Sequence, residues 1–133
     1  MLIEKLDGTS PRLYALIAPL VMRRSVLRQN NNYPFWTSRS HVWFVAREAE
    51  SVLGFVPVEI TDRGAKINNY YVSGDNTEIL SSLLGEVIRF SVGDLQPVRA
   101  IAHSRHAAVF RKYGFNSVRE WKYYVKMECE RNE

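Results

Sequence analysis

The sequence has one cysteine, no long apolar run, no internal repeat and no low-complexity tract. Cys129 alone cannot form an internal disulfide, which favours a reducing compartment such as the cytoplasm. The longest apolar stretch, residues 13–22, is far shorter than a membrane-spanning helix, which needs about 20 residues. Charges near the start of the chain and the lack of a small-residue cleavage site argue against a secretory signal. We therefore expect a soluble, cytoplasmic protein without membrane contact.

The composition is that of one globular domain, which we predict to span residues 1–133. Hydrophobic residues make up 46% of the chain and charged residues 24%, which excludes a disordered, collagen-like or coiled-coil protein. A chain of this length can bury roughly two-thirds of its unfolded surface, which is enough for an ordinary core. The formal charge is +4, so the chain permits anionic partners such as nucleotides or nucleic acid without requiring them.

The hydrophobic periodicity predicts an alternation of strands and helices along the chain. The predicted strands cover residues 2–6, 41–47, 51–60, 66–72, 96–102 and 121–127, and the predicted helices cover 11–21, 22–28, 79–88 and 104–113. With a final strand pair, the summed order is β-α-α-β-β-β-α-β-α-β-β. A meander followed by a β-α-β crossover predicts an α+β fold with a mixed central sheet and helices on both faces.

Local signals refine several of these elements. Pro57 cannot donate to a strand ladder, so we expect an edge or a bulge there. Asp75, followed three residues later by Glu78, resembles a capping box at the start of the central helix. Ser104 is the predicted cap of the last helix, which should stop at Gly114.

The segment from His103 to Phe115 resembles the late-helix motif of the GNAT acyltransferase superfamily, commonly written N-x-x-A-x-x-x-Y-x-K-x-G-F. Lys112 and Gly114 match this motif together with the terminal Phe115, and Phe110 stands at the Tyr position. Residues 53–55, Leu-Gly-Phe, are similar to the hydrophobic-Gly-hydrophobic run of the second meander strand. The element order also matches the family over nearly the whole chain.

The resemblance implies an acyl-CoA-dependent N-acyltransferase with acetyl-CoA or another acyl-CoA as cofactor and a small-molecule or protein amine as acceptor. In the family, the third meander strand splays from the next strand and the pantetheine enters the V between them. Catalytic candidates are His103 and Glu59. The residues that the resemblance places on the coenzyme are Tyr71, Val72, Ser73, Gly74, Asn76, His103 and Phe110. The long loop at residues 29–40 would lie over the acceptor.

The coenzyme loop of this chain is divergent. The family pattern R/Q-x-x-G-x-G/A supplies glycines and a helix N-terminus for the pyrophosphate, but the glycine-rich loop is missing here and the pattern falls on Asp75, Asn76, Glu78 and Leu80. Phe110 also lacks the hydroxyl that would make it a general acid.

Two alternatives therefore stay open beside acyl transfer. One is a GNAT-fold protein that has lost coenzyme binding and acts as a binding module. The other is a nucleic-acid- or nucleotide-modifying protein on the same scaffold, although no nucleic-acid motif is present. The histidines show no spacing that would predict a metal site, and a homodimer is kept open as an assembly state.

Overall fold

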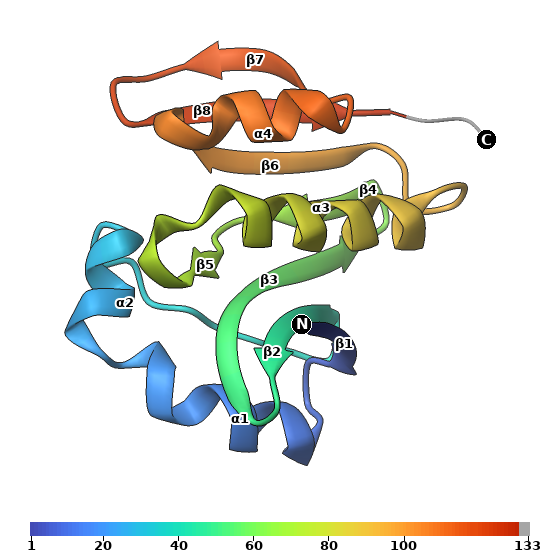
Figure 1. The fold of residues 1–133 in the computed structure, drawn as a ribbon. Coiled ribbons are helices and arrows are strands. Elements are labelled where there is room, and N and C mark those ends of the chain that lie inside the picture. The colour runs from blue at the N-terminus through green and yellow to red at the C-terminus, as the bar shows by residue number, and fades with distance from the viewer. Residues whose placement is uncertain (131–133) are drawn as a thin grey trace.

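The computed structural model describes residues 1–130 and contains a twisted eight-stranded sheet with helices on both faces (Figure 1). In chain order the elements are β1 (Leu2–Asp7), α1 (Pro11–Val21), α2 (Arg24–Gln29), β2 (His41–Glu48), β3 (Ser51–Thr61), β4 (Gly64–Ile67), β5 (Tyr71–Val72), the 3-10 turn η1 (Ser73–Asp75), α3 (Thr77–Ser91), β6 (Val98–His103), the 3-10 turn η2 (Ser104–His106), α4 (Ala107–Lys112), β7 (Asn116–Glu120) and β8 (Tyr124–Cys129).

The strand order is β1-β2-β3-β4-β6-β8-β7, and the short strand β5 pairs with β3. All pairings are antiparallel except β4 with β6, which run parallel because α3 crosses over between them. This confirms the predicted α+β class, the mixed sheet and the order of the elements.

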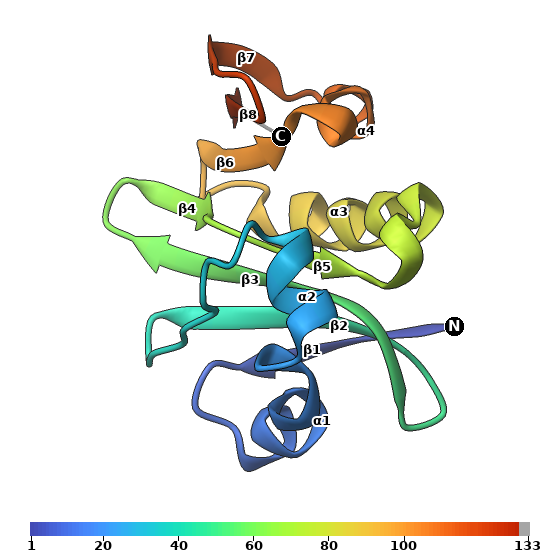
Figure 2. The same ribbon diagram turned by 90° about the vertical axis from the view of Figure 1, so that its left-hand side faces the viewer.

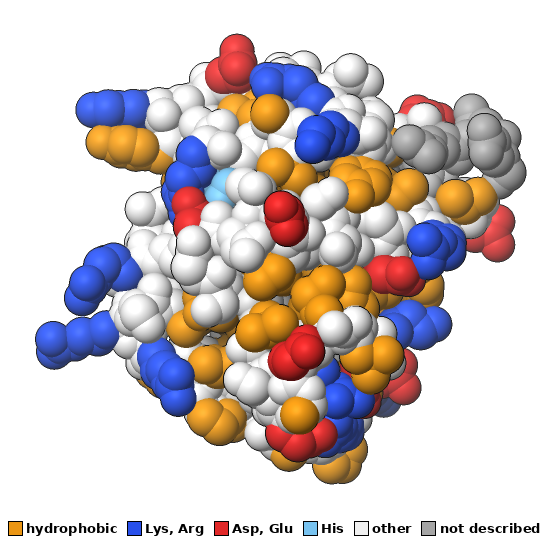
Figure 3. Space-filling model, viewed as in Figure 1, with side chains coloured by type: hydrophobic (Ala, Val, Ile, Leu, Met, Phe, Trp, Pro, Cys, Tyr) orange, Lys and Arg blue, Asp and Glu red, His pale blue; other side chains and the backbone are white. Residues whose placement is uncertain are grey.

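Two hydrophobic clusters cover opposite faces of the sheet because neighbouring strand residues point to opposite sides. In β2, Phe44 joins the larger cluster under α3 and α4, whereas Trp43 and Val45 join the smaller cluster under α1 and α2. Figure 2 shows α3 and α4 on one side of the sheet. Figure 3, in the same view as Figure 1, shows hydrophobic and charged side chains interspersed over the surface, with basic side chains around α2 at the left edge.

The third meander strand differs from its prediction. The expected continuous strand over 66–72 is divided into β4 and β5, and residues 68–70 between them belong to no strand. Pro57 lies within β3, which is flanked by β2 and β4. The predicted edge exists only locally. On this side of β3, residues 59–61 pair with β4 and residues 54 and 55 pair with β5, and Pro57 lies between these two paired segments. The bulge lies further along, at Ala46 and Arg47 of β2.

The helix caps and the last strand also need correction. Asn76, not Asp75, caps α3: its Oδ1 accepts hydrogen bonds from the N–H groups of Glu78 and Ile79 at 2.9 and 3.2 Å. Ser104 does not cap α4 and is instead the first residue of η2. Its hydroxyl is not available for a cap because it donates to a carbonyl in the β7–β8 turn. The strand predicted over 121–127 begins at residue 124, because residues 121–123 form that turn.

Within residues 1–130, no helix combines the length and the apolarity that crossing a bilayer would require.

The Asn76 cap is directly testable. Asn76→Ala should lower the free energy of unfolding by about 1 kcal/mol, because two N–H groups at the start of α3 lose their acceptor. Urea denaturation measures this change. Asn76→Ser keeps a capping oxygen and should retain most of the stability, so an equal loss in both variants would contradict the capping role.

Candidate functional site

The strands β4 and β6 diverge in the middle of the sheet. They are paired from Ala65–Val98 to Ile67–Ala100, and beyond that pair the chain of β5 turns to β3 instead. We call the space between β5 and the end of β6 the strand gap. It corresponds to the predicted splay of the third meander strand, and side chains of the protein itself fill it.

Tyr70 lies inside the strand gap and is fully buried. Its hydroxyl oxygen accepts a hydrogen bond from the backbone N–H of His103 at 3.0 Å and lies 2.7 Å from Nδ1 of His106. Both contacts are satisfied together when the Tyr70 hydroxyl donates to Nδ1 and the proton of His106 sits on Nε2. Burial raises the pKa of Tyr70, so the phenol stays neutral and can act as this donor.

Asp75 closes the same region at the mouth of the gap. Its carboxylate accepts two hydrogen bonds from the guanidinium of Arg105, at 2.7 and 3.1 Å. His106 Nε2 lies 2.8 Å from Asp75 Oδ1, close but not aligned as a hydrogen bond. The bonds from Arg105 hold the pKa of the Asp75 carboxyl below its usual value, so the carboxylate is ionised at neutral pH. These contacts tie η1 to η2 across the gap.

Gln29, the last residue of α2, forms hydrogen bonds to the backbone of β5 through its side-chain amide. Its side-chain nitrogen donates to the carbonyl of Val72 at 2.8 Å, and its side-chain oxygen accepts from the N–H of Val72 at 3.0 Å. One amide thus satisfies both polar groups of a strand residue, as a neighbouring strand would do.

His103 ends β6 as a buried side chain whose Nδ1 has no hydrogen-bond partner in the described structure. Burial, reinforced by the positive charge of Arg105 and by the neighbouring His106, lowers the pKa of His103 to about 4. Its ring packs at 5.3 Å from that of Tyr124. At neutral pH His103 is therefore an uncharged imidazole.

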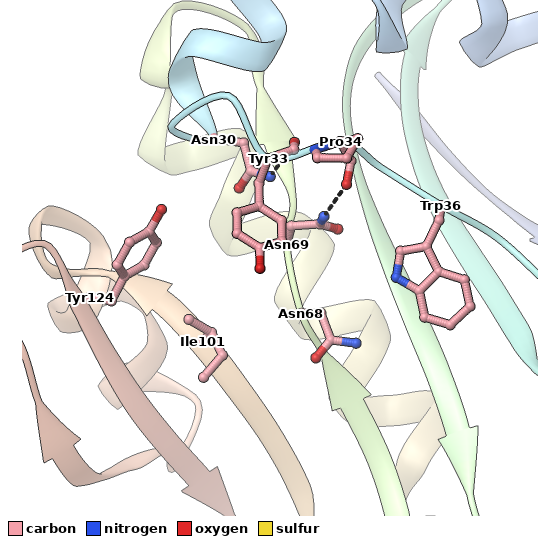
Figure 4. A pocket seen from close by; sticks show the side chains of 8 residues that line it. All are labelled: Asn30, Tyr33, Pro34, Trp36, Asn68, Asn69, Ile101 and Tyr124. Carbon is pink, nitrogen blue, oxygen red and sulfur yellow. Dashed lines mark hydrogen bonds between the residues drawn. The ribbon is translucent and has the colours of Figure 1, made fainter.

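A pocket of about 370 Å³ opens beside the strand gap. Figure 4 shows Tyr124 and Trp36 on opposite sides of it and asparagines between them. We call it the amide–aromatic pocket; its lining residues are Asn30, Tyr33, Pro34, Trp36, Asn68, Asn69, Ile101 and Tyr124. Part of the long loop at 29–40 thus forms one wall.

Glu59 and His103 lie at different sides of this pocket. Glu59 accepts a hydrogen bond from Asn68 Nδ2 at 3.2 Å, and His103 packs on Tyr124. Each therefore touches a lining residue, but they have no contact partner in common.

The remaining predicted coenzyme residues follow one another along the chain. Tyr71 and Val72 form β5, Ser73 and Gly74 begin η1, and Asn76 caps α3. Phe110 is fully buried on α4, 5.6 Å from the ring of Tyr70. Sequence reasoning missed the side chains that fill the gap, which are Gln29, Tyr70, Arg105 and His106.

No model of a known protein family matches this sequence, and no curated protein matches it. Solved structures do match. Escherichia coli ElaA has a TM-score of 0.75 at 16% identity, covering 98% of this chain and 100% of its own. An acyl-CoA N-acyltransferase from Pseudomonas aeruginosa has a TM-score of 0.70 at 17% identity, covering 97% and 99%. The PaiA N-acetyltransferase from Thermoplasma acidophilum, in complex with coenzyme A, has a TM-score of 0.68 at 15% identity, covering 98% and 100%.

These likenesses confirm the GNAT fold over the whole domain, and at such low identities they show the fold alone. The coenzyme associated with this fold does not fit the residues present. The N–H groups of Glu78 and Ile79 are capped by Asn76. The Asp75 carboxylate, bonded to Arg105, occupies the position that the resemblance assigns to the pyrophosphate. The backbone of Val72 is bonded to Gln29.

The buried histidine predicts a pH-dependent stability. Well above pH 6.5, His103 is neutral in both the folded and the unfolded chain and contributes nothing to the difference in stability. Between pH 6.5 and about 4, His103 binds a proton in the unfolded chain but stays neutral in the folded chain, so the free energy of unfolding falls as the pH falls. The full effect is about 3 kcal/mol.

Urea denaturation at pH 7 and pH 4.5 measures this loss. His103→Gln should show a clearly smaller loss than the wild type. His41→Gln is the control. Because burial also lowers the pKa of His41, this variant should lose the contribution of His41 to the pH dependence but keep the contribution of His103. Equal pH dependence in the wild type and His103→Gln would contradict the assignment.

Proposed function

We propose that this chain is a GNAT-fold binding protein in which the coenzyme site has been replaced by internal contacts of the chain. The observation that carries the proposal is the filled strand gap, which is crossed by Tyr70 to His103 and by Asp75 to Arg105, while Gln29 of α2 bonds the backbone of β5 at Val72. Each crossing joins segments that an inserted ligand would have to separate.

Two of these contacts resemble the chemistry of the missing ligand. The Asp75 carboxylate paired with Arg105 supplies an internal anion where the fold would receive a phosphate. The Gln29 amide bonds Val72 where the fold would receive the amide of a pantetheine arm. The chain therefore satisfies these groups without a coenzyme.

The polar contacts within the gap also resist opening. Removing one partner of a buried hydrogen bond leaves the other unsatisfied, at about 1–3 kcal/mol. A ligand inserted between Tyr70 and His103 would break the hydrogen bond from the N–H of His103 to the hydroxyl of Tyr70. Each of these two groups would then carry this penalty unless the ligand bonded to it.

The second candidate is an acyl-CoA-dependent N-acyltransferase acting on a small-molecule or protein amine. The divergence of β4 and β6 favours it, together with the whole-length likeness to acyltransferases. The Asp75–Arg105 pair is half-exposed, and such pairs contribute at most about 1 kcal/mol, so its opening alone would cost little. In this reading Glu59 and His103, each of which contacts a residue that lines the amide–aromatic pocket, would exchange the proton.

Calorimetric titration with acetyl-CoA separates the two candidates. The binding-protein proposal predicts no heat from the wild type. It also predicts none from Asp75→Asn, because the partners of Val72 and His103 remain in place.

Saturable binding by the wild type, with transfer to an amine, would overturn the proposal in favour of the acyltransferase. Binding by Asp75→Asn alone would identify Asp75 as a gate on a functional coenzyme site and would likewise overturn it. Asp94→Asn removes an exposed carboxylate outside the strand gap and is the control for the change in charge.

A further inference from the structure

A second pocket adjoins the amide–aromatic pocket. It has a volume of about 280 Å³ and shares Asn68 and Ile101 with its neighbour. Its lining includes the cations Lys66, Arg99 and Lys126 and no acidic side chain, so we call it the basic pocket. We propose that the two pockets form one site for a ligand that carries a nucleobase and a phosphate.

The strand register explains why the cations gather there. In β4, β6 and β8, the residues next to Lys66, Arg99 and Lys126 point into the core under α3 and α4. The three cations therefore share the opposite face of the sheet, and Figure 2 shows no helix over that side of β6 and β8.

The positive charge of this face is only partly balanced. Lys66 is in register with Arg99 on one side and with Glu59 on the other. The Arg99 guanidinium lies 3.9 Å from Glu128, a weak contact.

Lys126 is in register with Arg119, and like charges in facing positions destabilise a sheet. An anion bound in the basic pocket would relieve this repulsion. A phosphate group, which binds Lys and Arg well, fits this requirement.

The amide–aromatic pocket suits a planar ring. Trp36 is 53% exposed and Tyr33 is 70% exposed, and both border the pocket with Tyr124 (Figure 4). Exposed aromatic rings provide stacking surfaces for bases, worth about 1–3 kcal/mol for each stacked base. No charged side chain lines this pocket, which disfavours an ionic group there.

The asparagines of the pocket supply hydrogen-bond acceptors for the edge of a ring. The Nδ2 groups of Asn30, Asn68 and Asn69 already donate to oxygen atoms of the protein. Their Oδ1 atoms can accept hydrogen bonds from a ligand, and the second N–H of each amide can donate one. Acceptors between two aromatic surfaces match the N–H groups on the pairing edge of a nucleobase.

This inference deepens the proposed function by naming a ligand class, and it rests on that function only in taking binding as the role of the chain. A base in the amide–aromatic pocket and its phosphate in the basic pocket can come from a free nucleotide or from a single strand, since both present the same chemistry. The acetyl-CoA titration tests the strand gap separately, so the two results are independent.

Fluorescence anisotropy with a labelled oligothymidylate of about 15 nucleotides tests the site. We expect salt-dependent binding by the wild type. Lys66→Gln combined with Lys126→Gln should weaken it about tenfold and reduce the slope of log K against log salt by about 1.4, since each phosphate contact to a single strand contributes about 0.7. Trp36→Ala should weaken binding roughly 5- to 150-fold.

Matched controls test whether the loss of binding is specific to the face that carries the two pockets. Arg23→Gln with Arg24→Gln removes the same charge from exposed residues near α2, and Tyr14→Ala removes an exposed aromatic ring on α1. Both should bind like the wild type. Competition by thymidine monophosphate at concentrations similar to those of the oligonucleotide would support the site with a free nucleotide as its ligand, and much weaker competition would support it with a single strand. Absence of binding, or equal losses in the control variants, would overturn the proposal.

Discussion

The divergence of β4 and β6 after the Ile67–Ala100 pair is the constraint on which the rest of the site depends. Where two strands separate inside a protein, their backbone N–H and C=O groups lose their ladder partners and must find others. Here Tyr70 meets the N–H of His103, and Gln29 meets both polar groups of Val72. The polar network of the strand gap follows from this need.

Because side chains fill the gap, the surface available to a ligand lies elsewhere on the domain. The face under α3 and α4 is closed by the larger hydrophobic cluster, and the gap itself is closed by side chains. On the opposite face, the loop at 29–40 and the strands β4, β6 and β8 border two adjoining pockets. On this account the fold is retained as a scaffold while recognition occurs beside the gap.

Periodicity predicted the elements because their cause is local. Leu83, Leu84 and Val87 recur at helical spacing and are fully buried on α3, as expected. The resemblance predicted that the third meander strand splays, but nothing in the Asn68-to-Tyr70 stretch signals where the strand is interrupted and its pairing with β6 ends.

The role of Asp75 escaped sequence reasoning for the same reason. Its spacing to Glu78 suggested a local cap, but its partner Arg105 lies 30 residues away and becomes a neighbour only through the fold. The predicted catalytic roles of Glu59 and His103 and the predicted coenzyme contact of Phe110 stay predictions. The most direct test of the central claim is a crystal structure grown with excess coenzyme A. The account predicts no coenzyme between β5 and β6, with the Gln29–Val72 and Tyr70–His103 hydrogen bonds intact. A pantetheine arm lying in the strand gap with Gln29 displaced from Val72 would contradict it.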